Sequence, residues 1–174
     1  MWRNRPVQWI SLAAVVAGMG VASWAAPVLA PIADLSSSVR SVAKIETIRV
    51  LVNPLSVTIP GVRFSPKNVA EATARRFRRH GYKIVTSTDA PRLVLSNICL
   101  PHDDSTTKYS YTLYVTLEQP VEIPRLKHEM TVPTYINLTA GMDESERLGT
   151  RIGLGFRELV MKFIEDAQKA TSRY

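Results

Sequence analysis

The densest set of reactive side chains in the 174-residue sequence is the run from Cys99 to Asp104. A thiolate, an imidazole and a carboxylate are ligands that zinc accepts, and Cys99, His102 and Asp103 supply one of each. A zinc site needs three or four ligands, however, and no second pair of Cys or His lies at a motif spacing. We therefore expect no metal and no cofactor, but a buried Cys at a strand end followed by a polar turn. A metal-binding protein or enzyme centred on Cys99, His102 and Asp103 is the alternative.

Nucleophilic catalysis has little support in the sequence. It contains no Gly-x-Ser-x-Gly elbow, and a pair formed by Cys99 and His102 would need a third group to orient the base. Asp103 and Asp104 are adjacent, so in an extended chain their carboxylates point apart and do not easily share a proton. We therefore expect a protein that is not an enzyme.

A basic segment from Arg75 to Lys83 is the sharpest feature outside catalysis. On a helical projection the apolar residues form a buried face, and Arg75, Arg78 and Arg79 point outward. This surface suits phospholipid headgroups, lipopolysaccharide phosphates or an acidic partner. The alternative is a solvated helix face, because the helix dipole favours Arg near a C-terminal end.

Two further segments suit a partner. The link 53–64 contains Leu55, Val57 and Ile59, which is too apolar for an ordinary loop, so we expect it to extend the first strand or to pack under a partner. The hairpin tip 125–128 is basic, and its alternative interpretation is a plain polar turn. The residues that we predict to bind a partner or an anionic surface are Arg75, Arg78, Arg79, Lys83, Arg125 and Lys127.

The strands that position these residues are marked by β-branched and alternating apolar side chains. The pattern predicts strands at 47–52, 82–86, 93–100, 109–118 and 132–139. Within 109–118 the odd-numbered residues form a core face, and the even-numbered residues form a face exposed to water. The strand 93–100 begins with an apolar run on both faces, so we expect it to be central in its sheet.

The first long helix has clear signals at both ends. Ser65 is a good N-cap residue, and Pro66 suits the first helical turn. We expect this helix to run to about His80 and to be closed by Gly81.

The second long helix is expected from Glu144 to about Ala170. Asp143 and Glu146 resemble a capping box at its start. The glycines on its apolar face, Gly149 and Gly153, would let the helix come close to its neighbour.

These elements predict an α/β fold of the α+β type, with one mixed sheet and the order β-α-β-β-β-β-α. The first helix should connect parallel neighbouring strands, and both helices should pack on one face of the sheet. We assign residues 45–174 to a single domain.

The N-terminal residues 1–30 are typical of an export segment. Arg3 and Arg5 precede an apolar stretch, and small residues follow it, as in a cleaved signal peptide. Residues 7–26 are also long enough to be retained as a signal anchor in the inner membrane. We expect residues 31–44 to be a flexible tether, with the remainder of the chain in the periplasm under either interpretation.

The composition favours a bacterial envelope compartment. Cys99 is the only Cys, so the chain has neither an internal disulfide nor a lipidated Cys after the apolar stretch. The net charge of +7 falls to about +5 when Arg3 and Arg5 are removed with the export segment. A positive charge suits an envelope protein partner or an anionic lipid surface, and nucleic acid is not expected outside the cytoplasm.

The stretch from Gly81 to Leu95, followed by a long strand and a final amphipathic helix, resembles small α/β domains of bacterial envelope lipoproteins. These include the lipopolysaccharide-assembly and curli-secretion lipoproteins, and the resemblance covers about residues 46–170 at the level of pattern. It includes no catalytic motif, and this chain departs from it in having no lipidated Cys. We expect an exported, non-catalytic binding or assembly factor, with a membrane-tethered structural subunit as a further alternative.

Overall fold

The structure is a computed structural model, and it describes residues 35–102 and 107–173. The predicted export segment 1–30, the beginning of the predicted tether at 31–34 and Asp103 lie outside the described residues. In the part of the chain that is described, no helix is long and apolar enough to span a membrane.

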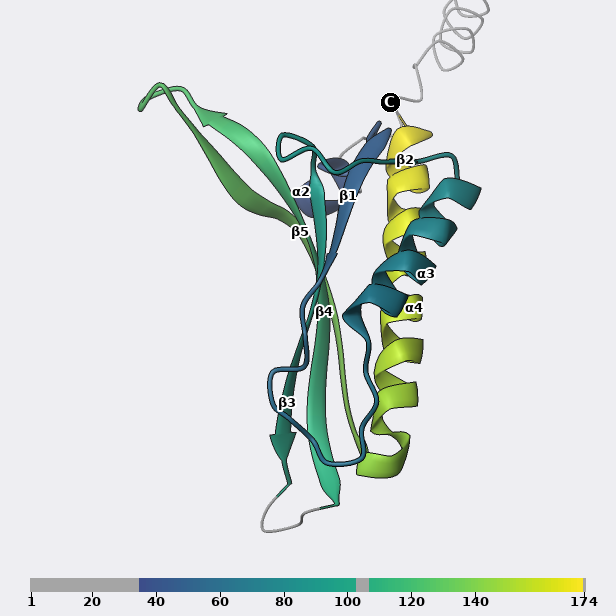
Figure 1. The fold of residues 1–174 in the computed structure, drawn as a ribbon. Coiled ribbons are helices and arrows are strands. Elements are labelled where there is room, and N and C mark those ends of the chain that lie inside the picture. Colours follow the sequence, from purple (N-terminus) through teal and green to yellow (C-terminus); the bar gives the residue numbers. More distant parts are fainter. Residues whose placement is uncertain (1–34, 103–106, 174) are drawn as a thin grey trace, which may run out of the picture. The chain divides into compact units, whose positions relative to one another are not determined.

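The described residues form one mixed five-stranded sheet, with the strand order β2-β1-β3-β4-β5 (Figure 1). Its strands are β1 (Thr47–Val52), β2 (Lys83–Ile84), β3 (Arg92–Pro101), β4 (Lys108–Ile123) and β5 (His128–Glu144). β1 is parallel to both β2 and β3, and β3, β4 and β5 are antiparallel neighbours. The predicted mixed sheet is therefore confirmed, with β3 at its centre and a helix joining the parallel neighbours β1 and β2.

The helices α3 (Pro66–Arg79) and α4 (Ser145–Thr171) both pack on one face of this sheet (Figure 1). Local signals set the ends of α3, because the Ser65 side chain accepts a hydrogen bond from the Asn68 amide at 3.3 Å and Pro66 occupies the first turn. After α3 the chain turns at Gly81, whose φ of +88° favours glycine.

The core lies between the sheet and these helices. Odd-numbered residues of β3 and β4 point toward the helices, and Leu93, Leu113 and Leu117 are fully buried. Phe163 of α4 lies 5.7 Å from the Phe77 ring and 5.2 Å from the Tyr135 ring, measured between ring centroids. These aromatic contacts join α3, α4 and β5 in one apolar core.

Residues 35–44, the described part of the expected tether, instead pack onto this domain. They include the short helix α2 (Ser37–Arg40), and Val42 is fully buried in the core. The Ser41 hydroxyl donates to the Thr134 carbonyl at 3.0 Å, and the Lys44 amide donates to Thr171 Oγ1 at 3.0 Å. Leu35 and Val42 are therefore core residues of the domain, and the two hydrogen bonds join this segment to β5 and α4.

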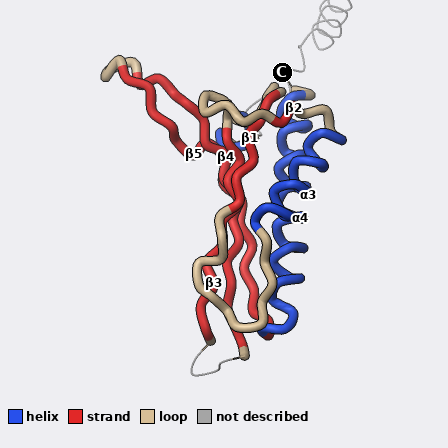
Figure 2. The backbone as a smooth tube through the Cα atoms, in the orientation of Figure 1, coloured by secondary structure: helices blue, strands red, loops and turns tan. Residues whose placement is uncertain are grey.

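The link between β1 and α3 runs beside β3 and then returns to α3 (Figure 2). Asn97 Nδ2 donates to the Pro54 carbonyl at 2.9 Å, and Ser56 Oγ accepts from the Cys99 amide at 2.8 Å. These bonds cover part of the β3 edge that β1 leaves beyond Val52. Ile59 then enters the core, so the apolar residues of the link pack against its own domain.

The start of α4 differs from the predicted capping box. Glu144 is the N-cap residue, and within the described residues its side chain makes no capping hydrogen bond. The Asp143 carboxylate instead accepts from Arg147 Nε and Arg151 Nε, both at 3.0 Å. The Glu144 backbone amide, followed by the two arginines, holds the pKa of Asp143 below its usual range.

The glycines of α4 have different surroundings. A Cβ on Gly149 would lie 3.0 Å from the Arg63 carbonyl oxygen, which confirms the close approach predicted there. A Cβ on Gly153 would have no described atom within 4 Å, so this glycine does not mark a close contact. Gly155 is the residue that approaches the sheet, because its Cβ would overlap the Leu113 side chain.

Candidate functional site

The six predicted binding residues lie on three separate elements. Arg75, Arg78 and Arg79 are exposed on α3, and Lys83 is exposed on the short edge strand β2. Arg125 and Lys127 are in the turn between β4 and β5, which projects away from the helices at the upper left of Figure 1. The structure thus brings only the α3 residues close together, and a binding role for the six residues remains a prediction.

Cys99 points toward the core and is fully buried. Its thiol lies 3.8 Å from Asn97 Oδ1, and burial raises the pKa of the thiol. Because its pKa is raised, Cys99 is mainly a protonated thiol, whereas the thiolate is the form that attacks carbonyls and binds zinc. Within residues 35–102 and 107–173, no group of three or more His, Cys, Asp or Glu could hold a metal ion. The geometry of Cys99 therefore does not favour the metal or enzyme alternative.

The feature that best fits a binding site is the sheet face opposite α3 and α4, which we call the open face. In the described chain it carries five large apolar side chains that are between 48% and 60% exposed. They are Ile98, Leu100, Ile136, Leu138 and Met142. All have even numbers on β3 or β5, and pairing through β4 places them on one face. Apolar exposure of this kind is a common property of interaction surfaces.

The open face is not uniformly apolar, because β4 places a row of hydroxyl groups between the two apolar rows. Thr112 pairs with Ile98 on one side and Ala140 on the other, and Tyr114 pairs with Leu138. The hydroxyl row consists of Ser110, Thr112, Tyr114 and Thr116. Within the described residues, none of these side chains makes a hydrogen bond. The face therefore offers apolar contact together with unused hydrogen-bonding groups.

The sequence contained part of this signal but assigned it incompletely. The even-numbered side of β4 was predicted to face water, which agrees with its half-buried hydroxyl groups. In β5, however, Ile136 and Leu138 alternate with Tyr135 and Asn137, and a pattern alone favours the aliphatic side as the core side. The register between β4 and β5 pairs Tyr135 with Leu117 on the core side of the sheet, and it leaves Ile136 and Leu138 exposed on the other side. This inversion depends on strand pairing, so it is not visible in one segment.

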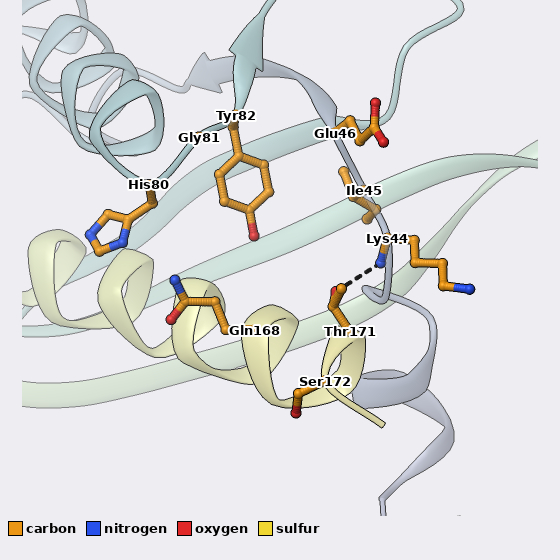
Figure 3. Close-up of a pocket in the computed structure, with 9 residues that line it drawn as sticks. All are labelled: Lys44, Ile45, Glu46, His80, Gly81, Tyr82, Gln168, Thr171 and Ser172. Atoms are coloured by element: carbon orange, nitrogen blue, oxygen red, sulfur yellow. Dashed lines mark hydrogen bonds between the residues drawn. The ribbon is translucent and has the colours of Figure 1, made fainter. Parts of the chain in front are cut away.

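A cavity of about 490 Å³ lies between the end of α4 and the segments that flank β1 and α3 (Figure 3). The phenol of Tyr82 points toward α4, where Gln168 and Thr171 line the opposite wall, whereas the side-chain ends of Lys44 and Glu46 point away. Burial raises the pKa of Tyr82, so its phenol is neutral. None of the six predicted residues lines this cavity.

Two basic residues that sequence reasoning did not select lie where α3 meets α4. Arg76 belongs to the basic segment but is not among the six predicted residues, and Arg157 on α4 was not singled out. Both line one cavity of about 220 Å³, together with Phe156 and Gly153. Arg157 follows Gly153 by one helical turn, but its closeness to Arg76 depends on how two helices pack.

Comparisons with known proteins show a weak resemblance. No protein-family model and no curated protein matches the sequence. Among solved structures, the chain is similar to a minor lipoprotein from Acinetobacter baumannii, with 9% identity, a TM-score of 0.41, and coverage of 73% of this chain and 93% of that chain. It is also similar to a hypothetical protein from Chlamydia trachomatis, with 11% identity, a TM-score of 0.39, and coverage of 70% and 96%.

A third similar structure is rare lipoprotein B from Shewanella oneidensis, with 13% identity, a TM-score of 0.27, and coverage of 71% of this chain and 89% of that chain. The weak, low-identity resemblance to envelope lipoproteins stated from the sequence is thus confirmed, and no specific family is shown. At these TM-scores the similarity is too weak to support a function.

Proposed function

We propose that this chain is an exported, non-catalytic binding or assembly factor of the bacterial cell envelope, and that it holds a protein partner on its open face. The observation that carries this proposal is the group of five large apolar side chains exposed on one side of a well-packed sheet. A stable domain that leaves Ile98, Ile136 and Leu138 about half exposed has an apolar surface available for binding.

The row of hydroxyl groups favours a protein over a lipid chain as the occupant. Burying a hydroxyl without a hydrogen bond costs about 1–3 kcal/mol, and a hydrocarbon chain offers no acceptor or donor. A protein surface covers Ile98 and Leu138 with apolar groups and pairs Thr112 and Tyr114 with its own polar atoms. Apolar area with dispersed hydrogen bonds is the usual composition of protein interfaces.

The export part of the proposal rests on the sequence. Residues 1–30 have the charge and apolar pattern of an export signal. Secreted eukaryotic domains of this size are usually rich in disulfides, so the single Cys at position 99 favours a bacterial envelope compartment. N-terminal sequencing of the protein isolated from a bacterial periplasmic or membrane fraction tests this. A new N-terminus near residue 26 or 30 indicates a free periplasmic protein, and an intact Met1 indicates an anchored one. Recovery in the cytoplasm overturns export.

The binding surface is tested by photo-cross-linking from single positions in living bacteria. A cross-linking residue at Ile98 or Leu138 should capture one defined envelope protein. The same residue at Leu154 should not, because Leu154 is 43% exposed on α4 but lies off the open face. Leu154 is thus a matched control of the same residue type as Leu138.

The captured protein is then purified and its affinity measured. The double substitution Ile136→Glu and Leu138→Glu should weaken binding at least about tenfold, because it places two charges in a buried apolar contact. Leu154→Glu should leave the affinity within about twofold. Capture of only a second copy of this chain, capture of lipid alone, or equal binding by the open-face variant would overturn the proposal.

A further inference from the structure

The outer surface of α3 and α4 carries a groove that is separate from the open face. One cavity of about 520 Å³ lies between the segment 62–65 and the first turns of α4, and it reaches Val69 and Gly153. A second cavity of about 220 Å³ shares Val69 and Gly153 with it and extends to Arg157. A third cavity of about 220 Å³ shares Arg76 with the second. The shared lining makes these three cavities one groove along both helices.

The two ends of this groove differ in chemistry. At one end, Val62, Phe64 and Val69 supply apolar side chains, and Gly153 leaves room above α4. At the other end, three arginines and Ala72 line the third cavity, and Arg76 and Arg157 add two guanidinium groups to the otherwise largely apolar second cavity. The basic residues there are Arg75, Arg76, Arg79 and Arg157.

The positive charge at this end is poorly balanced. Arg75 pairs with Glu71, with 3.9 Å between Arg75 Nη1 and Glu71 Oε2. Both side chains are more than half exposed, so this ion pair is weak. Within residues 35–102 and 107–173, Arg76, Arg79 and Arg157 form no ion pair. Burial, followed by the charges of Arg157, Arg79 and Arg75, lowers the pKa of Arg76. An anion bound among these groups would relieve their mutual repulsion.

Phosphate is the anion that fits this arrangement best. Arg presents a planar fork of donors that matches phosphate oxygens, and several arginines around a small cavity can satisfy three oxygens of a phosphate monoester together. A single carboxylate has only two oxygens and one charge. The neighbouring apolar cavity adds room for a hydrocarbon portion next to the phosphate.

We propose that the groove between α3 and α4 binds a ligand with a phosphate group and an apolar portion. The phosphate lies among Arg75, Arg76, Arg79 and Arg157, and the apolar portion lies along Val69 and Gly153 toward Phe64. This site does not depend on the open face, so either proposal can fail without the other. Two sources share this chemistry, namely the headgroup of a membrane lipid and a free phosphate ester.

Calorimetry with octyl phosphate below its micelle concentration tests the site on the purified protein. Octyl phosphate should bind at least about tenfold more tightly than inorganic phosphate, because the apolar cavity contributes. Octyl glucoside, which lacks the charge, should bind at least about tenfold more weakly than octyl phosphate. Equal binding of octyl phosphate and inorganic phosphate would overturn the apolar part of the site, and absence of octyl phosphate binding would overturn the proposal.

Substitutions of equal charge locate the site. The double variant Arg76→Gln and Arg157→Gln should lose at least about tenfold in affinity for octyl phosphate. The control Arg40→Gln and Arg173→Gln removes the same net charge at exposed positions that do not line the groove, and it should lose less than about twofold. Equal losses of affinity in both variants would show that the net positive charge of the protein attracts the anion without a specific site, and would overturn the proposal.

A third variant keeps the charges and fills the groove. Gly153→Met adds a side chain where a Cβ meets no described atom within 4 Å, so it should fold normally. This variant should lower the affinity for octyl phosphate at least about fivefold and leave the affinity for inorganic phosphate unchanged. Unchanged octyl phosphate binding by folded Gly153→Met would place the apolar portion elsewhere and overturn this geometry.

Vesicle co-sedimentation separates the two ligand sources. If a lipid headgroup is the source, vesicles containing phosphatidic acid should bind the protein, and vesicles of phosphatidylcholine should not. The double variant Arg76→Gln and Arg157→Gln should then abolish binding to the phosphatidic acid vesicles. Binding of octyl phosphate without vesicle binding supports a free phosphate ester. Vesicle binding without octyl phosphate binding would indicate adsorption to a charged surface and overturn the groove.

Discussion

The two faces of the sheet are built from the same strands and from similar side chains, but their surroundings are opposite. On the covered face, Leu93, Leu113 and Leu117 are fully buried beneath α3 and α4. On the open face, Ile98 and Leu138 are 48% and 60% exposed, although they are as apolar as the residues below the helices. Hydrophobicity alone therefore does not distinguish the face that stabilises the fold from the face that is available to a partner.

The difference shows which contacts the domain needs for its own stability. The covered face is completed by aromatic and aliphatic residues of α4, which pack directly against β4 and β5. The open face contributes little to the free energy of folding, because its side chains lose only part of their water-exposed area. This contrast supports the proposal that the open face binds a partner.

The largest expected contrast is between equivalent truncations on the two faces. Leu113→Ala removes a fully buried side chain and should lower the free energy of unfolding by about 2–5 kcal/mol. Ile136→Ala removes a side chain that is 55% exposed and should change it by no more than about 0.5 kcal/mol. Urea unfolding followed by circular dichroism measures both. Equal losses would mean that the open face is part of the folded core.

Alkaline pH provides a second test of the covered face. Tyr135 is buried there, and its hydroxyl donates to Asp166 Oδ2 at 2.9 Å. Burial, followed by the Asp166 hydrogen bond and charge, raises the pKa of Tyr135. The stability contributed by the neutral Tyr135 phenol is therefore fully present below the pKa of about 10 that tyrosine has in the unfolded chain. Above that pH the free energy of unfolding falls by up to about 1.4 kcal/mol per pH unit.

The measurement is urea unfolding of the wild type and of Tyr135→Phe between pH 8 and pH 11, as a rough working range around the unfolded pKa. The wild type should lose stability more steeply than Tyr135→Phe above about pH 10. The difference isolates Tyr135 from Tyr82 and Cys99, whose pKa values burial also raises. Parallel curves would show that ionisation of Tyr135 does not oppose folding.

Local signals explain how much of this fold was predictable. Ser65, Pro66 and Gly81 each act within one helical turn of the α3 ends, so the boundaries followed from the residues themselves. The fold class and the central position of β3 also followed from patterns along single segments.

The remaining features depend on contacts between distant segments. The core position of Val42 requires α4 and β5, and the exposure of Ile136 requires a register with β4. The basic end of the groove requires Arg76 and Arg157, which are far apart in the sequence, to meet across two helices. A single sequence contains the residues of these sites but not the packing that joins them.

Gly155 tests how tightly the covered face is packed against α4. Gly155→Ala adds a Cβ that would lie 2.5 Å from Leu113 Cδ1, inside a filled core. Overpacking costs about 1–3 kcal/mol, and the higher helix propensity of Ala offsets up to about 1 kcal/mol of it. We expect a net loss of about 1 kcal/mol in urea unfolding. Adding Leu113→Val should recover part of the loss, and full additivity of the two losses would argue against this contact.

The last contrast is with Gly153, two residues before Gly155 on the same helix. Gly153→Ala adds a Cβ with no described atom within 4 Å, so only the helix propensity changes. The substitution should raise the free energy of unfolding by about 0.5–1 kcal/mol, because glycine is a poor residue in a helix interior. Urea unfolding of Gly153→Ala and Gly155→Ala should therefore give changes of opposite sign. A loss at both positions would mean that packing extends to the groove side of α4, and that the groove is filled in solution.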